Sequence, residues 1–380
     1  MDYYYIFDRL MINILIITMN EKKLEKIGFY TLNDYRASQT SLSSPLWRCE
    51  LILTDKCNFT CPYCRGIEEE HKGNISWEDA SFIVKMWGEH HLKNVRFSGG
   101  EPTMWHVRDS NGNKKNLIDL VSLAKSVGIE RIAISTNGSI KTEFYDKLIE
   151  AGVNDFSISL DSCCAETGDK MAGDKPGSWK KVVNNIKHIS QKTYVTVGVV
   201  FTPENMSEFK ELVEFADSLG VSDIRILSSA QWNQAFYNIE FDEHLLSRHP
   251  ILQYRMKHFS GERHVRGLKD EHTHSCPLML DDMAILGGYH FPCVIYMREQ
   301  GNPVGKVDFS LSPKESIEKI RKERLNWILN NDTHQNQICK KNCLDACVDY
   351  NNKVFELNPN AYEYKVMNPK KIISIILKND

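Results

Sequence analysis

Three cysteines lie together in one short stretch of the sequence. Cys57, Cys61 and Cys64 have the spacing C-x3-C-x2-C, which arises by chance in roughly one chain in a hundred of this length. Structural zinc requires four protein ligands in a closed tetrahedral site, whereas three thiolates in one loop leave a position open. A 4Fe-4S cluster needs a ligand on each iron, so three cysteines leave one iron available to a substrate or cofactor. The spacing therefore predicts such a cluster, and a zinc site completed by His71 is the alternative.

Five further cysteines fall late in the chain: Cys276, Cys293, Cys339, Cys343 and Cys347. Gly287-Gly288 is typical of a tight hairpin turn, which would bring Cys276 and Cys293 to one cluster. The other three cysteines would supply the remaining ligands. Five thiolates fill one four-ligand 4Fe-4S cluster with one over, and a structural zinc is the alternative, since four thiolates suit zinc equally well. Which late cysteine is spare stays open. The remaining cysteines are interpreted as structural: Cys49, Cys163 and Cys164.

The elements that must position these residues are repeated βα units. Between residues 47 and 229, six β-rich runs alternate with amphipathic helical stretches, which indicates a parallel sheet flanked by helices. The runs cover residues 49–54, 94–98, 131–135, 155–160, 194–201 and 223–227. Six units without a seventh or eighth predict an α/β fold, a partial (β/α)6 TIM-like barrel, followed by a small cysteine-rich C-terminal domain.

Unusual residues follow the first four of these runs. They are the loop at Cys57, Gly99-Gly100-Glu101-Pro102, Asn137-Gly138 and Asp161. Active groups of such barrels gather at the carboxyl ends of the strands, because the strands hold the variable loops rigidly there. We therefore expect all of these residues to face one opening.

The segment Cys57-Asn58-Phe59-Thr60-Cys61-Pro62-Tyr63-Cys64, followed by Ser98-Gly99-Gly100-Glu101-Pro102, resembles the radical S-adenosylmethionine (SAM) superfamily. The resemblance covers residues 47–229, about half of the chain. It implies that the open iron chelates the amino and carboxylate groups of SAM. An electron from the reduced cluster would then cleave the sulfonium, giving methionine and a 5'-deoxyadenosyl radical that abstracts hydrogen from a substrate.

The resemblance also implies roles for individual residues. Tyr63 would lie against the adenine, and Gly99 and Gly100 would let the backbone approach the methionine end of SAM. Glu101 would supply a carboxylate to its ammonium group. Ribose-binding polar groups and an apolar adenine contact would come from the later strand ends: Asn137, Ser159, Asp161 and residues 197–201. Two alternatives stay open, since Asn137-Gly138 is also a common turn and Asp161 could cap a helix.

The late cysteines resemble the SPASM and twitch extensions of this superfamily through the spacing C-x11-G-x4-C between Cys276 and Cys293. A full SPASM domain carries seven cysteines for two clusters, so one auxiliary 4Fe-4S cluster is the better interpretation, with two incompletely ligated clusters as the alternative. Other polar or aromatic candidates for contact with a substrate or a cluster are equally well explained by solvation or packing: His272, His274, Tyr296, Arg298, Trp105 and Trp232. The predicted domains are residues 1–45 (N-terminal appendage), 46–232 (barrel), 233–275 (connector), 276–350 (SPASM/twitch-like auxiliary domain) and 351–380 (tail).

The function implied is hydrogen abstraction from a substrate, with a ribosomally made peptide as the leading choice. A small molecule such as an aminoglycoside-type sugar is the alternative substrate. A non-catalytic zinc-binding scaffold is the alternative hypothesis from a different functional class. The expected electron donor is a flavodoxin or ferredoxin. Because residues 1–45 are too short for the leader-binding domain of many peptide maturases, a peptide substrate would need a separate leader-recognition protein.

The composition limits the binding partners and the cellular compartment that we expect. Lys and Arg number 47 against 50 Asp and Glu, a net charge of -3, so no global footprint for nucleic acid or an anionic membrane is expected. The longest apolar run, residues 11–19, is about half of the roughly 20 residues that span a bilayer. Eleven clustered cysteines indicate metal ligation in a reducing, cytoplasmic compartment.

Overall fold

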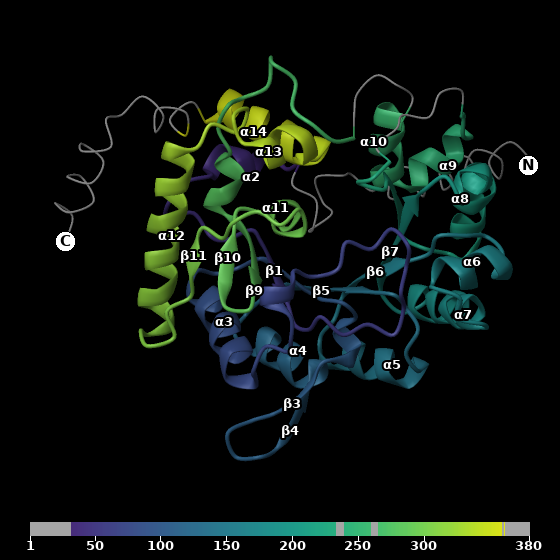
Figure 1. The fold of residues 1–380 in the computed structure, drawn as a ribbon, viewed down its shortest axis with the longest axis horizontal. Coiled ribbons are helices and arrows are strands. Elements are labelled where there is room, and N and C mark those ends of the chain that lie inside the picture. Colours follow the sequence, from purple (N-terminus) through teal and green to yellow (C-terminus); the bar gives the residue numbers. More distant parts are fainter. Residues whose placement is uncertain (1–31, 233–238, 260–264, 359–360, 362–380) are drawn as a thin grey trace, which may run out of the picture.

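The computed structural model of the chain describes residues 32–232, 239–259, 265–358 and 361 (Figure 1). A nine-stranded sheet runs through it in the order β11-β10-β9-β1-β2-β5-β6-β7-β8. Its six consecutive parallel strands are β1 (Arg48–Ile52), β2 (Asn94–Ser98), β5 (Arg131–Thr136), β6 (Asp155–Ser159), β7 (Tyr194–Phe201) and β8 (Asp223–Ser228). They coincide with the six predicted runs to within two residues at either end. The predicted α/β fold with a partial parallel barrel is confirmed.

Helices follow the strands and cover one face of the sheet. They are α3 (Trp77–Glu89), α4 (Leu117–Ser126), α5 (Thr142–Ala151), α6 (Ala165–Met171), α7 (Ser178–Ser190) and α8 (Phe209–Ser218). Short elements connect them: η2 (Glu69–His71), η3 (Pro102–Met104), the hairpin of β3 (His106–Arg108) and β4 (Lys114–Asn116), and η4 (Met206–Glu208).

The two faces of the strands carry different side chains. Val95 and Phe97 of β2 are buried in the main hydrophobic core, whereas Arg96 and Ser98 alternate with them and point to the other face. Parallel strands covered on both faces are usually apolar throughout. A charged and polar row along the inner face therefore indicates that the barrel encloses a polar cavity.

The late-cysteine region extends the barrel sheet. β9 (Asp282–Leu286) pairs in parallel with all five residues of β1, and β10 (Tyr289–Phe291) returns antiparallel to it. Gly287 and Gly288 form the turn with φ of +56° and +81°, a conformation that side chains disfavour. The predicted hairpin is thus present, and β11 (Gly305–Lys306) continues the sheet beyond it.

Further helices surround this hairpin: η5 (Pro277–Leu280), α11 (Val294–Arg298), α12 (Pro313–Asn330), α13 (Gln337–Asn342) and α14 (Asp345–Leu357). α14 continues across residue 350, so the predicted boundary between the auxiliary domain and the tail lies within a helix. Residues 362–380 of that tail lie outside the described residues.

The predicted connector, residues 233–275, also contains helices, although its sequence shows no clear apolar periodicity. They are α9 (Glu243–Arg248) and α10 (Pro250–Phe259). The periodicity of α10 is masked because two of its buried residues are polar: Arg255 and His258 both form ion pairs with Asp345 at the start of α14. This charged contact joins the barrel side of the chain to the late-cysteine region.

The N-terminal segment is not an appendage where the structure describes it. α2 (Asp34–Gln39) packs on α14, and Figure 1 shows both beside α13. Arg36 of α2 donates from Nε to Asp281 over 3.0 Å and stacks over the ring of Tyr350, 4.3 Å from its centroid. Residues 1–31, with the apolar run at 11–19, lie outside the described residues. No helix in the described ranges is long and apolar enough to cross a membrane.

This contact gives a first prediction. Changing Arg36 to Met leaves Asp281 buried without its cation, which we expect to cost about 3–5 kcal/mol in the free energy of unfolding. The matched control is Lys353→Met, because Lys353 also joins α14 to α2 through an ion pair with Asp34, but at the surface. That pair should contribute at most about 1 kcal/mol. Denaturant unfolding of both variants measures the difference, and equal losses would contradict the assignment.

Candidate functional site

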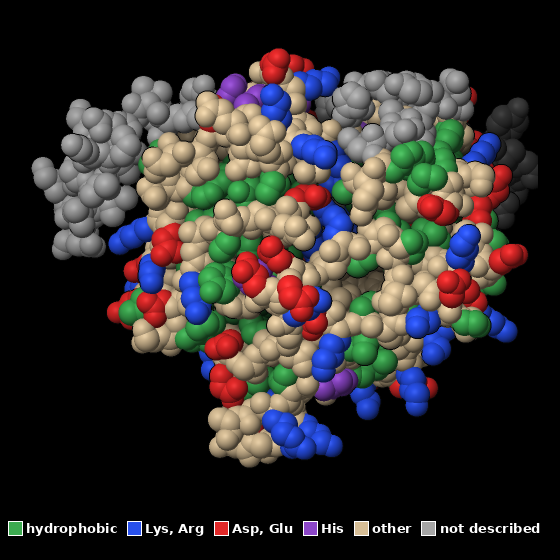
Figure 2. Space-filling view, viewed as in Figure 1, with side chains coloured by type: hydrophobic (Ala, Val, Ile, Leu, Met, Phe, Trp, Pro, Cys, Tyr) green, Lys and Arg blue, Asp and Glu red, His purple; other side chains and the backbone are tan. Residues whose placement is uncertain are grey.

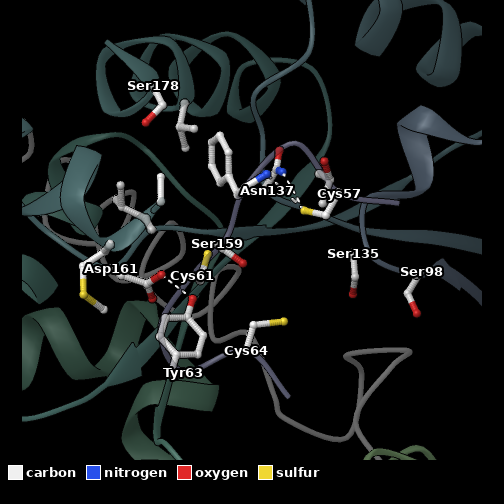
Figure 3. A pocket seen from close by; sticks show the side chains of 18 of the residues that line it. Cys57, Cys61, Tyr63, Cys64, Ser98, Ser135, Asn137, Ser159, Asp161 and Ser178 are labelled. Atoms are coloured by element: carbon white, nitrogen blue, oxygen red, sulfur yellow. Dashed lines mark hydrogen bonds between the residues drawn. The ribbon is translucent and has the colours of Figure 1, made fainter. Parts of the chain in front are cut away.

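A cavity of about 280 Å³ opens at the carboxyl ends of the parallel strands, and Cys57, Cys61 and Cys64 line it (Figure 3). Cys57 and Cys64 are exposed, Cys61 is half-buried, and all eleven cysteines of the chain are free. The predicted binding residues that line the same cavity are Tyr63, Gly99, Gly100, Asn137, Ser159 and Asp161. The loops thus meet in one opening, as the strand pattern predicts.

Gly99 and Gly100 bring two backbone segments together. The Gly100 amide donates to the Thr54 carbonyl and the Glu101 amide to the Lys56 carbonyl, both over 2.7 Å. A Cβ on Gly99 would lie 2.5 Å from the Thr54 carbonyl oxygen, and one on Gly100 would lie 2.5 Å from that of Asp55. These glycines therefore let the loop after β2 pack directly on the segment that leads into Cys57.

Glu101 is not among the described residues that line the cavity, and the predicted contact of its carboxylate with the SAM ammonium group stays a prediction. The side chain is 1% exposed, and its oxygens accept hydrogen bonds from the Thr136 hydroxyl over 2.8 Å and the Asn137 amide over 2.7 Å. The hydroxyl and amide of Thr103 donate to it as well. Burial raises the pKa of Glu101. Its carboxylate instead fixes the end of β5, which carries Asn137 into the site.

Asn137 lies beside Cys57 (Figure 3). Its Nδ2 donates to Asn58 over 2.9 Å and lies 3.7 Å from the Cys57 sulfur. Its Oδ1 accepts from the Ser139 amide, so the turn interpretation of Asn137-Gly138 also holds. Asn137 is thus placed to touch both the cysteine loop and whatever the cavity binds.

Tyr63 and Asp161 form the other side of the cavity. The tyrosine hydroxyl donates to one carboxylate oxygen of Asp161, and the other accepts from the Val200 amide over 2.9 Å. Burial raises the pKa of Asp161 to about 6. Asp161 caps no helix, because Cys164 is the N-cap of α6. Ser159 completes this wall at the end of β6.

The apolar adenine contact predicted for residues 197–201 is not present. Val197, Val199 and Phe201 are packed in the hydrophobic core, and no residue of this stretch is among the described residues that line the cavity. The alternation of β7 places these side chains on the helix-covered face. Trp105 is core as well, since it is fully buried and its indole donates to the Ile75 carbonyl.

The five late cysteines line a second cavity between η5, α11, α13 and α14, together with His272 and Tyr296. The backbone amide of Tyr296 donates to the sulfur of Cys293 over 3.4 Å. The side-chain amide of Asn351 donates to the sulfur of Cys276 over 3.6 Å. Burial raises the pKa of Cys276 and of Cys293 to about 12. Thiols gathered in this way ionise readily only beside a bound cation, which fits a metal centre. His274 instead stacks on His334.

His71 does not complete the first cysteine group. Among the residues that the structure describes, the three potential metal ligands found within 4.8 Å of one another are Glu68, Glu70 and His71, without a cysteine. His71 packs on Tyr289, with the ring centroids 5.2 Å apart.

Several arginines near the site belong to no recognisable sequence motif. A third cavity, of about 240 Å³, shares Glu50, Ser135 and Arg298 with the first and Cys293 and Cys347 with the second. The other arginines that line it are Arg48, Arg65, Arg96, Arg225 and Arg255. Three of these stand inside the β-rich runs or next to them, where charges alternating with apolar residues are the signal that identifies the inner face of the barrel.

Comparisons with known proteins agree with this geometry. Residues 51–216 match the family model described as the radical SAM superfamily. A probable GTP 3',8-cyclase of Sulfurisphaera tokodaii is 26% identical over 208 residues, which cover 54% of this chain and 63% of the relative. The enzyme of the same name from Saccharolobus solfataricus is 28% identical over 48% of this chain and 57% of its own length. The chain thus spans less than two thirds of these curated relatives.

Two solved structures share the fold. Streptococcus suis SuiB bound to S-adenosylmethionine superposes with a TM-score of 0.50 at 16% identity, covering 73% of this chain and 68% of SuiB. Native anSMEcpe with bound AdoMet gives a TM-score of 0.50 at 14% identity, covering 84% of this chain and 99% of anSMEcpe. The family model, the partial parallel barrel and the cysteine loop agree, and residues 51–216 are similar to the radical SAM superfamily.

Proposed function

We propose that this protein reductively cleaves SAM at a 4Fe-4S cluster held by Cys57, Cys61 and Cys64, and that the resulting 5'-deoxyadenosyl radical abstracts hydrogen from a substrate. The observation that carries the proposal is the first cavity, where these three thiols, and no other cysteine of the chain, face the polar ends of β5 and β6. Three thiolates leave one iron open to a ligand. A non-catalytic zinc scaffold would not need such an opening.

The bound cluster would supply one electron to the sulfonium of SAM, and a reduced flavodoxin or ferredoxin would replace that electron. The chain's own residues would bind and orient the cofactor. Tyr63, with its hydroxyl tied to Asp161, offers a fixed aromatic surface to the adenine, and Asn137 and Ser159 offer polar groups to the ribose. Gly99 and Gly100 expose backbone to the methionine end.

The late cysteines would hold one auxiliary 4Fe-4S cluster. All five line one cavity, together with few other polar groups. An auxiliary cluster beside the substrate could accept the electron that the substrate radical loses when it is oxidised. A structural zinc remains the competing occupant, and iron analysis distinguishes the two.

A ribosomally made peptide is the proposed substrate. A structure of SuiB bound to its precursor peptide SuiA superposes with a TM-score of 0.51 at 14% identity, and one of anSMEcpe with a bound peptide gives 0.50 at 15%. A small molecule is the second candidate, because the curated relatives that match the barrel are named as GTP cyclases. A peptide substrate would call for a separate leader-recognition protein.

The direct test uses the full chain, reconstituted with iron and sulfide under anaerobic conditions. Supplied with SAM and a strong reductant, it should form 5'-deoxyadenosine and contain about eight irons per chain. Loss of the SAM cleavage activity at full iron content would refute the proposed function. Candidate peptides and nucleotides are then compared by the rate of 5'-deoxyadenosine formation, which the true substrate should stimulate.

The auxiliary site gives a separate prediction. Changing all five late cysteines together to Ala should lower the iron content from about eight to about four per chain. SAM cleavage at the first cluster should persist, since none of the five lines that cavity. Cys163→Ser is the matched control, because Cys163 belongs to neither group and donates to Glu208. Iron unchanged in the variant without the late cysteines, or about four irons with zinc in the wild type, would exclude this auxiliary cluster.

A further inference from the structure

A histidine and two acidic residues meet in the loop that follows the first cysteine group. Glu68, Glu70 and His71 each place one potential ligand atom within 4.8 Å of the others. They belong to η2 and its N-cap, between Cys64 and α3. Figure 2 shows several Asp and Glu side chains gathered near the centre of the view, over the hairpin of β9 and β10. None of the three residues lines the cavity of the first cysteine group, so the proposed function gives them no role.

Aromatic packing fixes the imidazole of His71. Its ring packs on Tyr289, with the centroids 5.2 Å apart, and meets Phe291 edge to face at 5.9 Å. Nδ1 lies beside the turn of the same hairpin, 3.9 Å from the position of a Cβ on Gly287. The side chain is 8% exposed, and its Nε2 is directed at Glu70. The hairpin therefore sets the direction in which this nitrogen points.

Nε2 of His71 is closed off from solvent and has no hydrogen-bond partner among the described residues. It lies 3.4 Å from Oε1 of Glu70, beyond the usual limit of about 3.2 Å for a nitrogen donor. This contact is an ion pair only when the imidazole carries a second proton. Buried polar atoms without a partner are rare in folded proteins, and an unmodified one calls for an explanation. A ligand on Nε2 would supply the missing partner.

The two carboxylates also lack a basic partner from Lys or Arg. Glu68 does not cap η2 through its side chain, and its carboxylate forms no hydrogen bond or ion pair within the described ranges. Glu70 is 71% exposed and contacts His71. Glu69 between them differs, because its Oε2 pairs with Nζ of Lys72 over 2.5 Å. Two carboxylates this close repel each other unless a cation lies between them. Glu68 and Glu70 are therefore arranged as the acidic half of a cation site.

The donor set suits a divalent first-row metal ion, for which imidazole and carboxylate are ordinary ligands. Zinc, for example, holds imidazole nitrogen and carboxylate oxygen at about 2.0–2.2 Å, which places two ligands of a tetrahedral site about 3.4 Å apart. Nε2 of His71 and Oε1 of Glu70 are separated by 3.4 Å. Because Glu70 is exposed, an ion can enter from solvent and keep water in its remaining positions.

We propose that Glu68, Glu70 and His71 bind a divalent metal ion such as Mn²⁺, Fe²⁺ or Zn²⁺, at a site separate from both groups of cysteines. The ion would hold the loop between Cys64 and α3 in the conformation in which His71 packs on the hairpin of β9 and β10. The inference does not depend on SAM cleavage, since no cysteine takes part and the three residues lie outside the lining of the first cavity.

Titration with Mn²⁺ tests the site. The full chain is used, with its iron-sulfur sites reconstituted under anaerobic conditions. Mn²⁺ prefers oxygen and nitrogen ligands to thiolates, so the cysteines should not compete for it. The paramagnetic resonance signal of free Mn²⁺ falls as the ion binds, which measures the affinity and the number of ions bound. We expect one ion per chain, and a temperature of unfolding that rises with the concentration of Mn²⁺.

Three single variants identify the ligands. Glu70→Gln should weaken Mn²⁺ binding at least about tenfold, because a charged ligand is lost, and the exposed position should tolerate the change. His71→Phe should weaken it as much while keeping a ring against Tyr289 and Phe291. Glu69→Gln is the matched control, because it removes the same charge from the same loop at a carboxylate that pairs with Lys72. It should bind Mn²⁺ as the wild type does.

The outcomes decide the inference. Binding that Glu70→Gln and His71→Phe weaken and Glu69→Gln does not supports the site. If the folded wild type binds no Mn²⁺, the site is refuted, and a protonated His71 neutralises Glu70 instead. Equal losses in Glu69→Gln and Glu70→Gln would also overturn it, since general attraction to an acidic loop would then explain the binding. So would a folded His71→Phe protein that binds like the wild type. Formation of 5'-deoxyadenosine tests the proposed function separately.

Discussion

Protein with Cys57, Cys61 and Cys64 all changed to alanine forms no 5'-deoxyadenosine above the level of a protein-free mixture. Each of the three thiols would hold a different iron, and no other cysteine among the described residues lines their cavity to replace them. Iron should fall from about eight to about four per chain, because the late cysteines keep their own cluster. Chromatography of the reaction mixture and iron analysis measure both effects.

Two single variants test this prediction further. Cys61→Ala alone should give the same loss of product, whereas Cys49→Ala, a change in the hydrophobic core, should retain the full iron content and the activity of the wild type. Cleavage of SAM by the triple variant would show that the first cluster lies elsewhere. The Cys49 control separates loss of a ligand from loss of a thiol in general.

Gly100→Ala is expected to have the second-largest effect. A Cβ at this position would lie 2.5 Å from the Asp55 carbonyl oxygen and closer still to that of Lys56. Both are backbone atoms directly before Cys57, so they can move away only if the cysteine loop opens. We expect this variant to lose most of the iron of the first site and at least about tenfold in 5'-deoxyadenosine formation, since an ordinary packing clash already costs about 1–3 kcal/mol.

Gly112→Ala is the matched control for this substitution. Gly112 has a φ of +84° but open space around the position of a Cβ. Alanine there would cost roughly 1–2 kcal/mol of backbone strain without touching the site. Gly100 shows no positive φ, so its effect isolates the contact between the loops. Equal iron contents in the two variants would contradict the role given to Gly100.

Local patterns in the sequence predicted most of the fold. Alternation within short runs located six of the seven parallel strands, and Gly287-Gly288 located the hairpin that β9 forms with β10. The cysteine spacing predicted which thiols share a cavity. Each strand, the hairpin and the first cysteine group depend on neighbours within about twenty residues, which a single sequence displays directly.

The features that the sequence did not reveal depend on partners far along the chain. Glu101 is buried because Thr136 and Asn137, about 35 residues later, donate hydrogen bonds to it from the end of β5. Arg36 is buried because it contacts Asp281, 245 residues away, so the N-terminal segment looked like an appendage. No local sequence pattern encodes such long-range contacts.

The pairing of β9 with β1 has a consequence for electron transfer. Five residues in register fix the hairpin with Cys293 to the strand that leads to Cys57, side by side at the usual spacing of about 4.8 Å. The distance between two redox centres attached to this shared sheet would be constant. Hinge bending or the binding of a partner would not change it. Electron tunnelling over this fixed distance would vary with the driving force and the reorganisation energy, so the timing of turnover would depend on these and on substrate entry.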